Sequence, residues 1–194
     1  MDTSAPSVAG HVSPESSDIA RQYAVVSLFL VPAFITVTAL TWADPMPVAR
    51  AEVLLGPVFG MAALTAVVFL LMLVARNAAI IMQKASIEYF RVFLGDAGPD
   101  WVERPARTFN NLMQVPTIFY VMCAMMMHTQ LVDSVQVSLA WAFVTSRVLH
   151  AFVFVGWNDV KWRFATAQVG FVIMGILMYR FAAQSLPLWN PFDG

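Results

Sequence analysis

Five long apolar stretches constrain the fold of this chain more than any other feature. They cover about Gln22–Ala43, Val53–Ala75, Thr108–Val132, Ser134–Trp157 and Phe164–Gln184. A helix needs roughly 20 apolar residues to cross a bilayer, and each stretch reaches that length. Charged residues make up 12% of the sequence, whereas soluble domains typically contain about 25%. The sequence therefore predicts an all-α integral membrane protein.

The five stretches divide into two membrane parts that follow a polar tail. Residues 1–20 are acidic and rich in Ser and Pro, so we expect a tail without a core of its own. The first apolar stretch is not preceded by the short basic region of a signal peptide. We therefore interpret residues 21–44 as a retained transmembrane helix and residues 53–194 as a four-helix membrane domain.

Basic residues are distributed unevenly between the flanks of the five spans. Eight of the 11 Lys and Arg residues lie on alternate flanks, which share one side, whereas the other side carries Arg50 and Arg180. Because Lys and Arg accumulate in cytoplasmic loops, we expect a cytoplasmic N-terminus and a periplasmic C-terminus, in a bacterial inner membrane. The eight residues are Arg21, Arg76, Lys84, Arg91, Arg104, Arg107, Lys161 and Arg163.

Several kinds of site find no support in the sequence. Cys123 is the single cysteine, so no internal disulfide can form, and the net charge of −1 gives no indication of nucleic-acid binding. The run "MCAMMMH" (Met122–His128) contains soft ligands suited to Cu(I). Consecutive Met residues point in different directions on a helix, however, so we interpret the run as packing and predict no metal site.

Polar residues form a stripe at the start of the third span. Arg107, Asn111 and Gln114 are spaced i, i+4, i+7, which places them on one helix face over about 10 Å. Pro116 follows, and inside a helix it removes a hydrogen bond and usually kinks the backbone. Amides also join membrane helices to one another, so each residue alone has a structural interpretation as well.

Further polar residues are expected at the same membrane level. Arg147 and His150 share one face of the fourth span, Arg163 opens the fifth span, and Arg76 closes the second. Arg76 and Arg163 lie close enough to the surface to extend toward water. Arg147 lies too deep for that and needs an anion or a carbonyl partner. Since these spans contain no acidic residue, we expect a cleft for an anionic ligand, such as a small carboxylate or a lipid headgroup.

The stretch "ERPARTFNNLMQVPTIFY" (103–120) resembles the signature of the MAPEG superfamily, the membrane-associated proteins in eicosanoid and glutathione metabolism. The pattern there is roughly E-R-x-x-R-x-x-x-N-x-x-E followed by Pro. "SRVLHAFVF" resembles the R-x-x-H pattern of the family's third helix, and "NDVKWR" resembles the loop before its last helix. The resemblance covers about residues 53–184, as four helices in order.

The resemblance implies a four-helix bundle, usually a homotrimer, that holds glutathione between subunits near the cytoplasmic side. Residues that correspond to Arg107, Asn111 and Gln114 contact glutathione in enzymatic members, and an arginine, here Arg147 or Arg163, stabilises the thiolate. Positive charge favours the thiolate, which is the nucleophile. The implied activity is a glutathione transferase or peroxidase acting on a lipophilic substrate from the bilayer. We also expect Arg76 and His150 to contribute to the glutathione-binding site.

The chain departs from the family pattern at three places. Gln114 replaces an acid, Phe154 stands where several enzymes carry a Tyr, and the helix at 21–44 is additional. The superfamily also has a non-enzymatic member, and a fold does not fix an activity. The alternative is therefore a non-catalytic scaffold or accessory subunit that binds membrane lipid, or a partner membrane protein through the additional helix.

Overall fold

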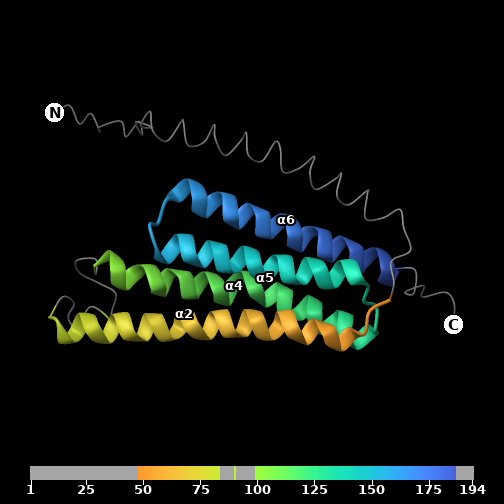
Figure 1. The fold of residues 1–194 in the computed structure, drawn as a ribbon, viewed down its shortest axis with the longest axis horizontal. Coiled ribbons are helices and arrows are strands. Elements are labelled where there is room, and N and C mark those ends of the chain that lie inside the picture. The colour runs from red at the N-terminus through yellow and green to blue at the C-terminus, as the bar shows by residue number, and fades with distance from the viewer. Residues whose placement is uncertain (1–47, 84–89, 91–98, 187–194) are drawn as a thin grey trace, which may run out of the picture.

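The computed structural model describes residues 48–83, 90 and 99–186, and these form a bundle of four long helices (Figure 1). Successive helices run in opposite directions, and the most extensive contacts are those between α2 and α4 and between α5 and α6. The predicted tail and the additional helix at 21–44 lie outside the described residues. The elements are the short 3-10 helix η1 (Ala51–Leu54), α2 (Leu55–Ile81), α4 (Asp100–Thr129), α5 (Ser134–Val155) and α6 (Val160–Ser185).

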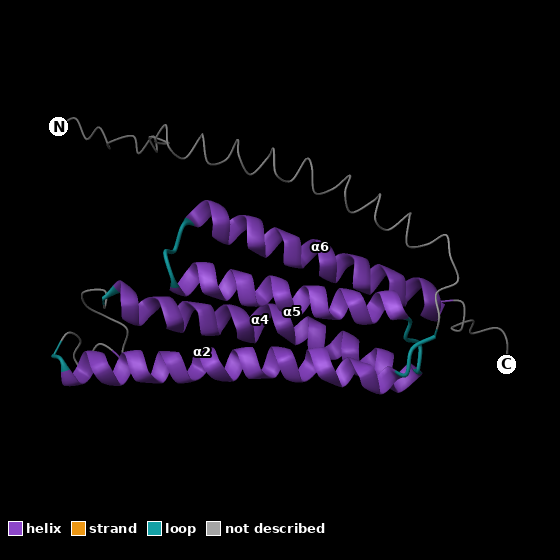
Figure 2. Cartoon of the chain, viewed as in Figure 1, coloured by secondary structure: helices purple, strands orange, loops and turns teal. Residues whose placement is uncertain are grey.

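All four long helices have the length and the apolar composition needed to cross a membrane, so the chain is an integral membrane protein. Three helices extend beyond the predicted spans: α2 continues past Ala75, α4 begins at Asp100 instead of Thr108, and α6 begins at Val160 instead of Phe164. The early start of α4 has a physical reason, because Asp100 and Glu103 lie in its first turn, where acidic groups complement the helix dipole. Short loops connect α4 to α5 and α5 to α6 (Figure 2).

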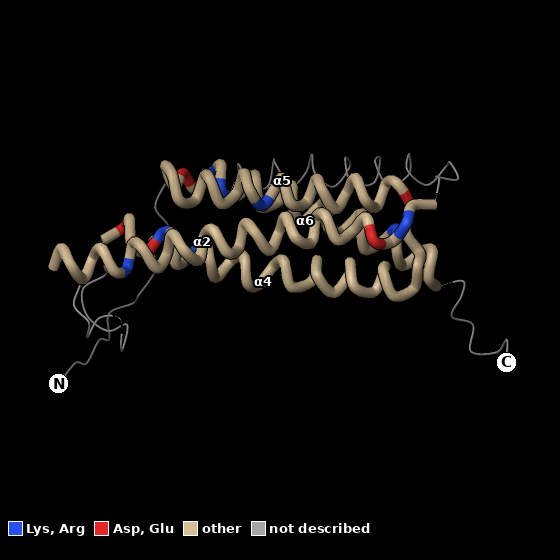
Figure 3. Tube along the Cα trace, turned by 60° about the horizontal axis from the view of Figure 1, so that its bottom comes forward, with Lys and Arg blue, Asp and Glu red and all other residues tan. Residues whose placement is uncertain are grey.

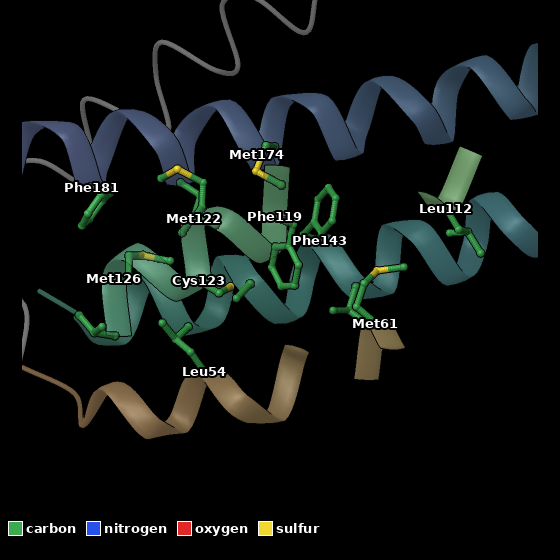
Figure 4. Packing of buried hydrophobic residues seen from close by; sticks show 14 of the residues in the cluster. Leu54, Met61, Leu112, Phe119, Met122, Cys123, Met126, Phe143, Met174 and Phe181 are labelled. Atoms are coloured by element: carbon green, nitrogen blue, oxygen red, sulfur yellow. The ribbon is translucent and has the colours of Figure 1, made fainter. Parts of the chain in front are cut away.

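The core between the helices consists of apolar side chains (Figure 4). The rings of Phe119 and Phe143 stack with centroids 4.9 Å apart, joining α4 to α5. Met122, Cys123 and Met126 are buried in the same cluster, so this part of the methionine run packs the core, whereas Met125 is exposed. Within the described residues, no group of His, Cys, Asp and Glu side chains could hold a metal ion.

Two glycines allow α2 to approach α5 closely. A Cβ atom added at Gly56 would lie 3.1 Å from the Trp141 ring, and one added at Gly60 would lie 3.3 Å from it. Small residues spaced four apart commonly permit such contacts between membrane helices. Here the indole of Trp141 fills the space within the chain, so this face of α2 is part of the bundle.

A buried ion pair joins α5 and α6 at the end of the bundle where both termini of the described chain lie. Asp133 caps α5 by accepting a hydrogen bond from the backbone N–H of Gln136 at 2.9 Å. Its other carboxylate oxygen accepts hydrogen bonds from Nε of Arg180 and from Nε2 of Gln184, both at 2.7 Å. Arg180, which the sequence indicated only as a flanking charge, is therefore a buried structural residue of this end.

Candidate functional site

A cavity of about 290 Å³ lies at the opposite end, beside the connection between α5 and α6. Lys and Arg gather toward this end, whereas the middle of the bundle is almost uncharged (Figure 3). The cavity brings together four of the seven predicted site residues, although their helices are far apart in sequence. Its lining consists of Asn111 and Val115 from α4, Arg147 and His150 from α5, and Val160, Arg163, Phe164, Ala167 and Phe171 from α6.

Arg147 is held by backbone oxygens of α6. The residue is 3% exposed, and its Nη2 donates to the carbonyl oxygens of Thr166 at 3.1 Å and Ala167 at 3.2 Å. A buried guanidinium needs such partners because leaving a charge without them in a membrane is costly. The predicted need for an anion or a carbonyl partner is thus met by carbonyl groups, and the arginine ties α5 to α6 at the wall of the cavity.

The guanidinium of Arg147 can lie at this position because residue 170 is a glycine. A Cβ atom at Gly170 would overlap the guanidinium and lie 2.7 Å from its Cζ and 2.8 Å from Oγ of Ser146. Every other residue type carries a Cβ, so only glycine leaves the space that the arginine fills. Gly170 was not among the residues predicted from the sequence, where the available signal was a glycine inside an apolar span that faces another span with a buried arginine.

His150 also joins α5 to α6. Its Nδ1 lies 3.1 Å from the carbonyl oxygen of Arg163 and 3.1 Å from Oγ1 of Thr166. The ring is 7% exposed and meets the Phe154 ring edge to face at 6.0 Å. Contacts from both helices therefore fix the orientation of the imidazole against the cavity.

Arg163 lies over an aromatic ring. The guanidinium carbon is 3.6 Å from the centroid of Phe154, a cation–π contact, and Nη1 donates to Oδ1 of Asn158 at 2.9 Å. Phe154 is 3% exposed, and it thus acts as a platform that positions the arginine beside the cavity. In the sequence, Phe154 is notable only for its missing hydroxyl, because a cation–π contact between two helices has no signature in sequence.

Of the remaining predicted site residues, Asn111 lines the cavity, whereas Arg76, Arg107 and Gln114 do not. Asn111 is half-buried at its edge, and its side chain donates to the carbonyl oxygen of Arg107 at 3.2 Å. Arg107 and Gln114 share one face of α4, as their spacing predicts, but both are exposed and neither lines the predicted cleft. Arg76 is on α2, with its guanidinium 5.6 Å from the ring centroid of Phe90. A single copy of the chain therefore brings together Asn111, Arg147, His150 and Arg163, but not Arg76, Arg107 or Gln114.

Arg104 stabilises the end of the bundle next to the cavity. Its Nη1 donates to the carbonyl oxygen of Gly156 at 2.8 Å, and its Nη2 lies 3.1 Å from a carboxylate oxygen of Asp100. The first contact joins α4 to the residue that follows α5. The two arginines of the "ERPAR" motif therefore differ in their surroundings. Arg104 contacts the residue after α5, whereas Arg107 is exposed on α4.

A comparison with models of protein families gives a match to the model of the MAPEG family over residues 54–183. The matched region begins at the end of η1 and ends within α6, so it contains all four membrane helices and the cavity. No curated protein and no solved structure matches the chain.

Proposed function

The chain belongs to the MAPEG family, and from that premise we propose that it is a glutathione-dependent transferase or peroxidase acting on a lipophilic electrophile. One observation carries the proposal: a cavity toward one end of the membrane bundle is lined by Arg147, His150, Arg163 and Asn111. Its lining among the described residues contains two guanidinium groups and no carboxylate, which suits an anionic ligand such as glutathione.

We assign to Arg163 the role of stabilising the glutathione thiolate. A nearby positive charge favours the thiolate form, and the thiolate is the reactive nucleophile. Arg163 is half-buried and oriented by Phe154 and Asn158, whereas Arg147 is almost fully buried and bound to two carbonyl groups. Arg147 then contributes positive potential from the wall of the cavity, and Asn111 supplies an amide for the peptide.

Arg107 and Gln114 can contribute to the proposed site if the chain forms an oligomer. Both side chains are exposed on a membrane helix of the single chain, and polar groups that face lipid are unfavourable. A second copy packed on this face of α4 would cover them and bring them toward glutathione bound between copies. We therefore propose a homotrimer in which Arg107, Gln114 and Arg76 contribute to the peptide-binding part of the site.

The end with the cavity is proposed to face the cytoplasm of a bacterial cell, in its inner membrane. Positive charges are concentrated at this end, in agreement with the general excess of Lys and Arg on the cytoplasmic side. Trp101, Trp157 and Trp162 are exposed there, and tryptophan is enriched where a membrane meets water. Glutathione would then enter from the cytoplasm, and the second substrate from the bilayer.

A conjugation assay tests the proposed activity. The purified full chain in detergent is incubated with glutathione and a lipophilic enone, and the adduct is measured against a reaction without protein. We expect turnover that saturates in glutathione and is lost in Arg163→Met but kept in Lys161→Met, an exposed cation two residues away. A chain without conjugation or peroxidase activity, but with bound lipid or a co-purified membrane complex, would instead fit the non-catalytic scaffold.

Restoring the acid at position 114 is expected to tighten glutathione binding. Gln114→Glu replaces a neutral contact with the ammonium group of the peptide by a charged one, and charge-assisted hydrogen bonds are roughly twice as strong. We expect the dissociation constant to fall about tenfold, which corresponds to about 1.4 kcal/mol. Calorimetric titration checks this value, with Asn110→Asp, an exposed amide on the same helix, as the control. An equal affinity for wild type and Gln114→Glu would place residue 114 outside the site.

A further inference from the structure

The hydrogen bonds of His150 identify which ring nitrogen carries the proton. Nδ1 lies 3.1 Å from the carbonyl oxygen of Arg163, and a carbonyl oxygen can only accept a hydrogen bond. In a neutral imidazole one nitrogen is a donor and the other an acceptor. Nδ1 is therefore the donor, and Nε2 has a free lone pair.

Thr166 supports the same assignment. Its hydroxyl donates to the carbonyl oxygen of Trp162 at 2.8 Å and also lies 3.0 Å from that of Arg163. Because the hydroxyl hydrogen is directed at backbone oxygens of its own helix, Oγ1 is left to accept from Nδ1 of His150 at 3.1 Å. Two acceptors on α6 thus select the same tautomer of the ring.

The lone pair of Nε2 belongs to a ring that lines the cavity, and no hydrogen bond within the described part of the chain involves it. The charged groups that face the ring are Arg147 from its own helix and Arg163 from α6. The lining residues of α4, Asn111 and Val115, are uncharged. Guanidinium and amide groups are very weak bases, so among the described lining residues Nε2 is the group able to take up a proton.

We propose that His150 is the general base of this site and removes the thiol proton of glutathione through Nε2. The inference rests on the proposed function and divides the work between two residues: His150 takes the proton, and Arg163 stabilises the thiolate. The S–H bond breaks as the N–H bond forms. The thiolate then forms an S–C bond with the β-carbon of an enone, the π electrons move to the α-carbon and oxygen, and Nε2 returns its proton to the α-carbon. The sum is an addition without oxidation or reduction.

His150→Asn tests this role because its amide nitrogen can replace Nδ1 as a donor to the Arg163 carbonyl, while no base remains at the position of Nε2. The full chain is assayed with glutathione and a lipophilic enone. We expect glutathione affinity within about twofold of wild type, a weaker ultraviolet absorption of bound thiolate near neutral pH, and kcat lower by about 100-fold, in line with general-base catalysis. The deficit should shrink as pH rises, because solution hydroxide then deprotonates the thiol.

The outcomes separate the two proposals. Thiolate absorption and kcat like those of wild type in His150→Asn would overturn the role of His150 while leaving the glutathione activity in place. A wild-type chain that neither binds nor conjugates glutathione would overturn both. If His150→Asn does not fold, nitrogen NMR of a His11→Gln, His128→Gln variant, in which His150 is the remaining histidine, reports the tautomer directly. A proton on Nε2 and a lone pair on Nδ1 would contradict the proposal.

Discussion

Asp133→Ala is expected to lower the free energy of unfolding by about 3–5 kcal/mol, because it leaves the Arg180 guanidinium buried without its carboxylate. Asp133 and Arg180 are 5% and 8% exposed, and they meet at 2.7 Å. The substitution also removes the cap of α5, which typically contributes about 0.5–2 kcal/mol. The change can be measured from unfolding transitions in detergent.

Two variants distinguish the ion pair from the cap. Asp133→Asn keeps an oxygen that can cap Gln136 but removes the charge, so it should retain part of the stability. The double variant Asp133→Ala, Arg180→Met should be less destabilised than the sum of its single variants, since it leaves no unpaired charge. Arg50→Met is the control, because Arg50 is an exposed cation of the same end. Equal losses for Arg50→Met and Arg180→Met would contradict the importance of the pair.

Gly170→Ala is expected to disrupt the wall of the cavity. Alanine favours a helix over glycine by about 1 kcal/mol, which alone would stabilise α6. The new Cβ would overlap the Arg147 guanidinium, however, and displace it from the carbonyl groups of Thr166 and Ala167. Hydrogen bonds from charged groups contribute about 1.5–3 kcal/mol each, so the loss should exceed the gain. We expect a net destabilisation of about 1–3 kcal/mol and at least tenfold weaker glutathione binding.

Gly170→Ala in a second background tests whether its effect comes from overlap with the side chains packed against residue 170. In a Ser146→Ala, Arg147→Ala background, neither the guanidinium nor the Ser146 hydroxyl lies against residue 170, so adding Gly170→Ala should be neutral or slightly stabilising. Gly175→Ala, a change of the same kind on the same helix, should leave glutathione binding unchanged. Thermal unfolding and calorimetric titration give both quantities. If Gly170→Ala were as stable as wild type and bound glutathione equally well, the position of Arg147 would be wrong.

The helices were predictable from sequence because their cause is local. Each span needs a long apolar segment, and the break between α5 and α6 at "GWND" is visible in the chain. Deviations arose where a helix continued past its apolar part, as α4 does at Asp100. Apolar length identifies the segment that crosses the membrane, but capping and charge at the ends decide where the helix begins.

The candidate site was predictable only in part. The spacing of Arg147 and His150 indicated one face of a helix, and that face does line the cavity. Their partners were not visible, because the contacts of Arg147 with the backbone of α6 and of Arg163 with Phe154 depend on how two helices pack. Asp133 and Arg180 show the same limit: they are 47 residues apart, and each alone is typical of a helix end.

Calorimetric titration of the full chain with glutathione tests the central claim most directly, which is that the cavity beside Arg163 holds this peptide. The account predicts saturable binding to wild type, at least tenfold weaker binding to Arg163→Met, and unchanged binding to Lys161→Met, in which an exposed cation of the same helix turn is removed. Absence of binding to wild type, or equal affinity for wild type and Arg163→Met, would contradict it.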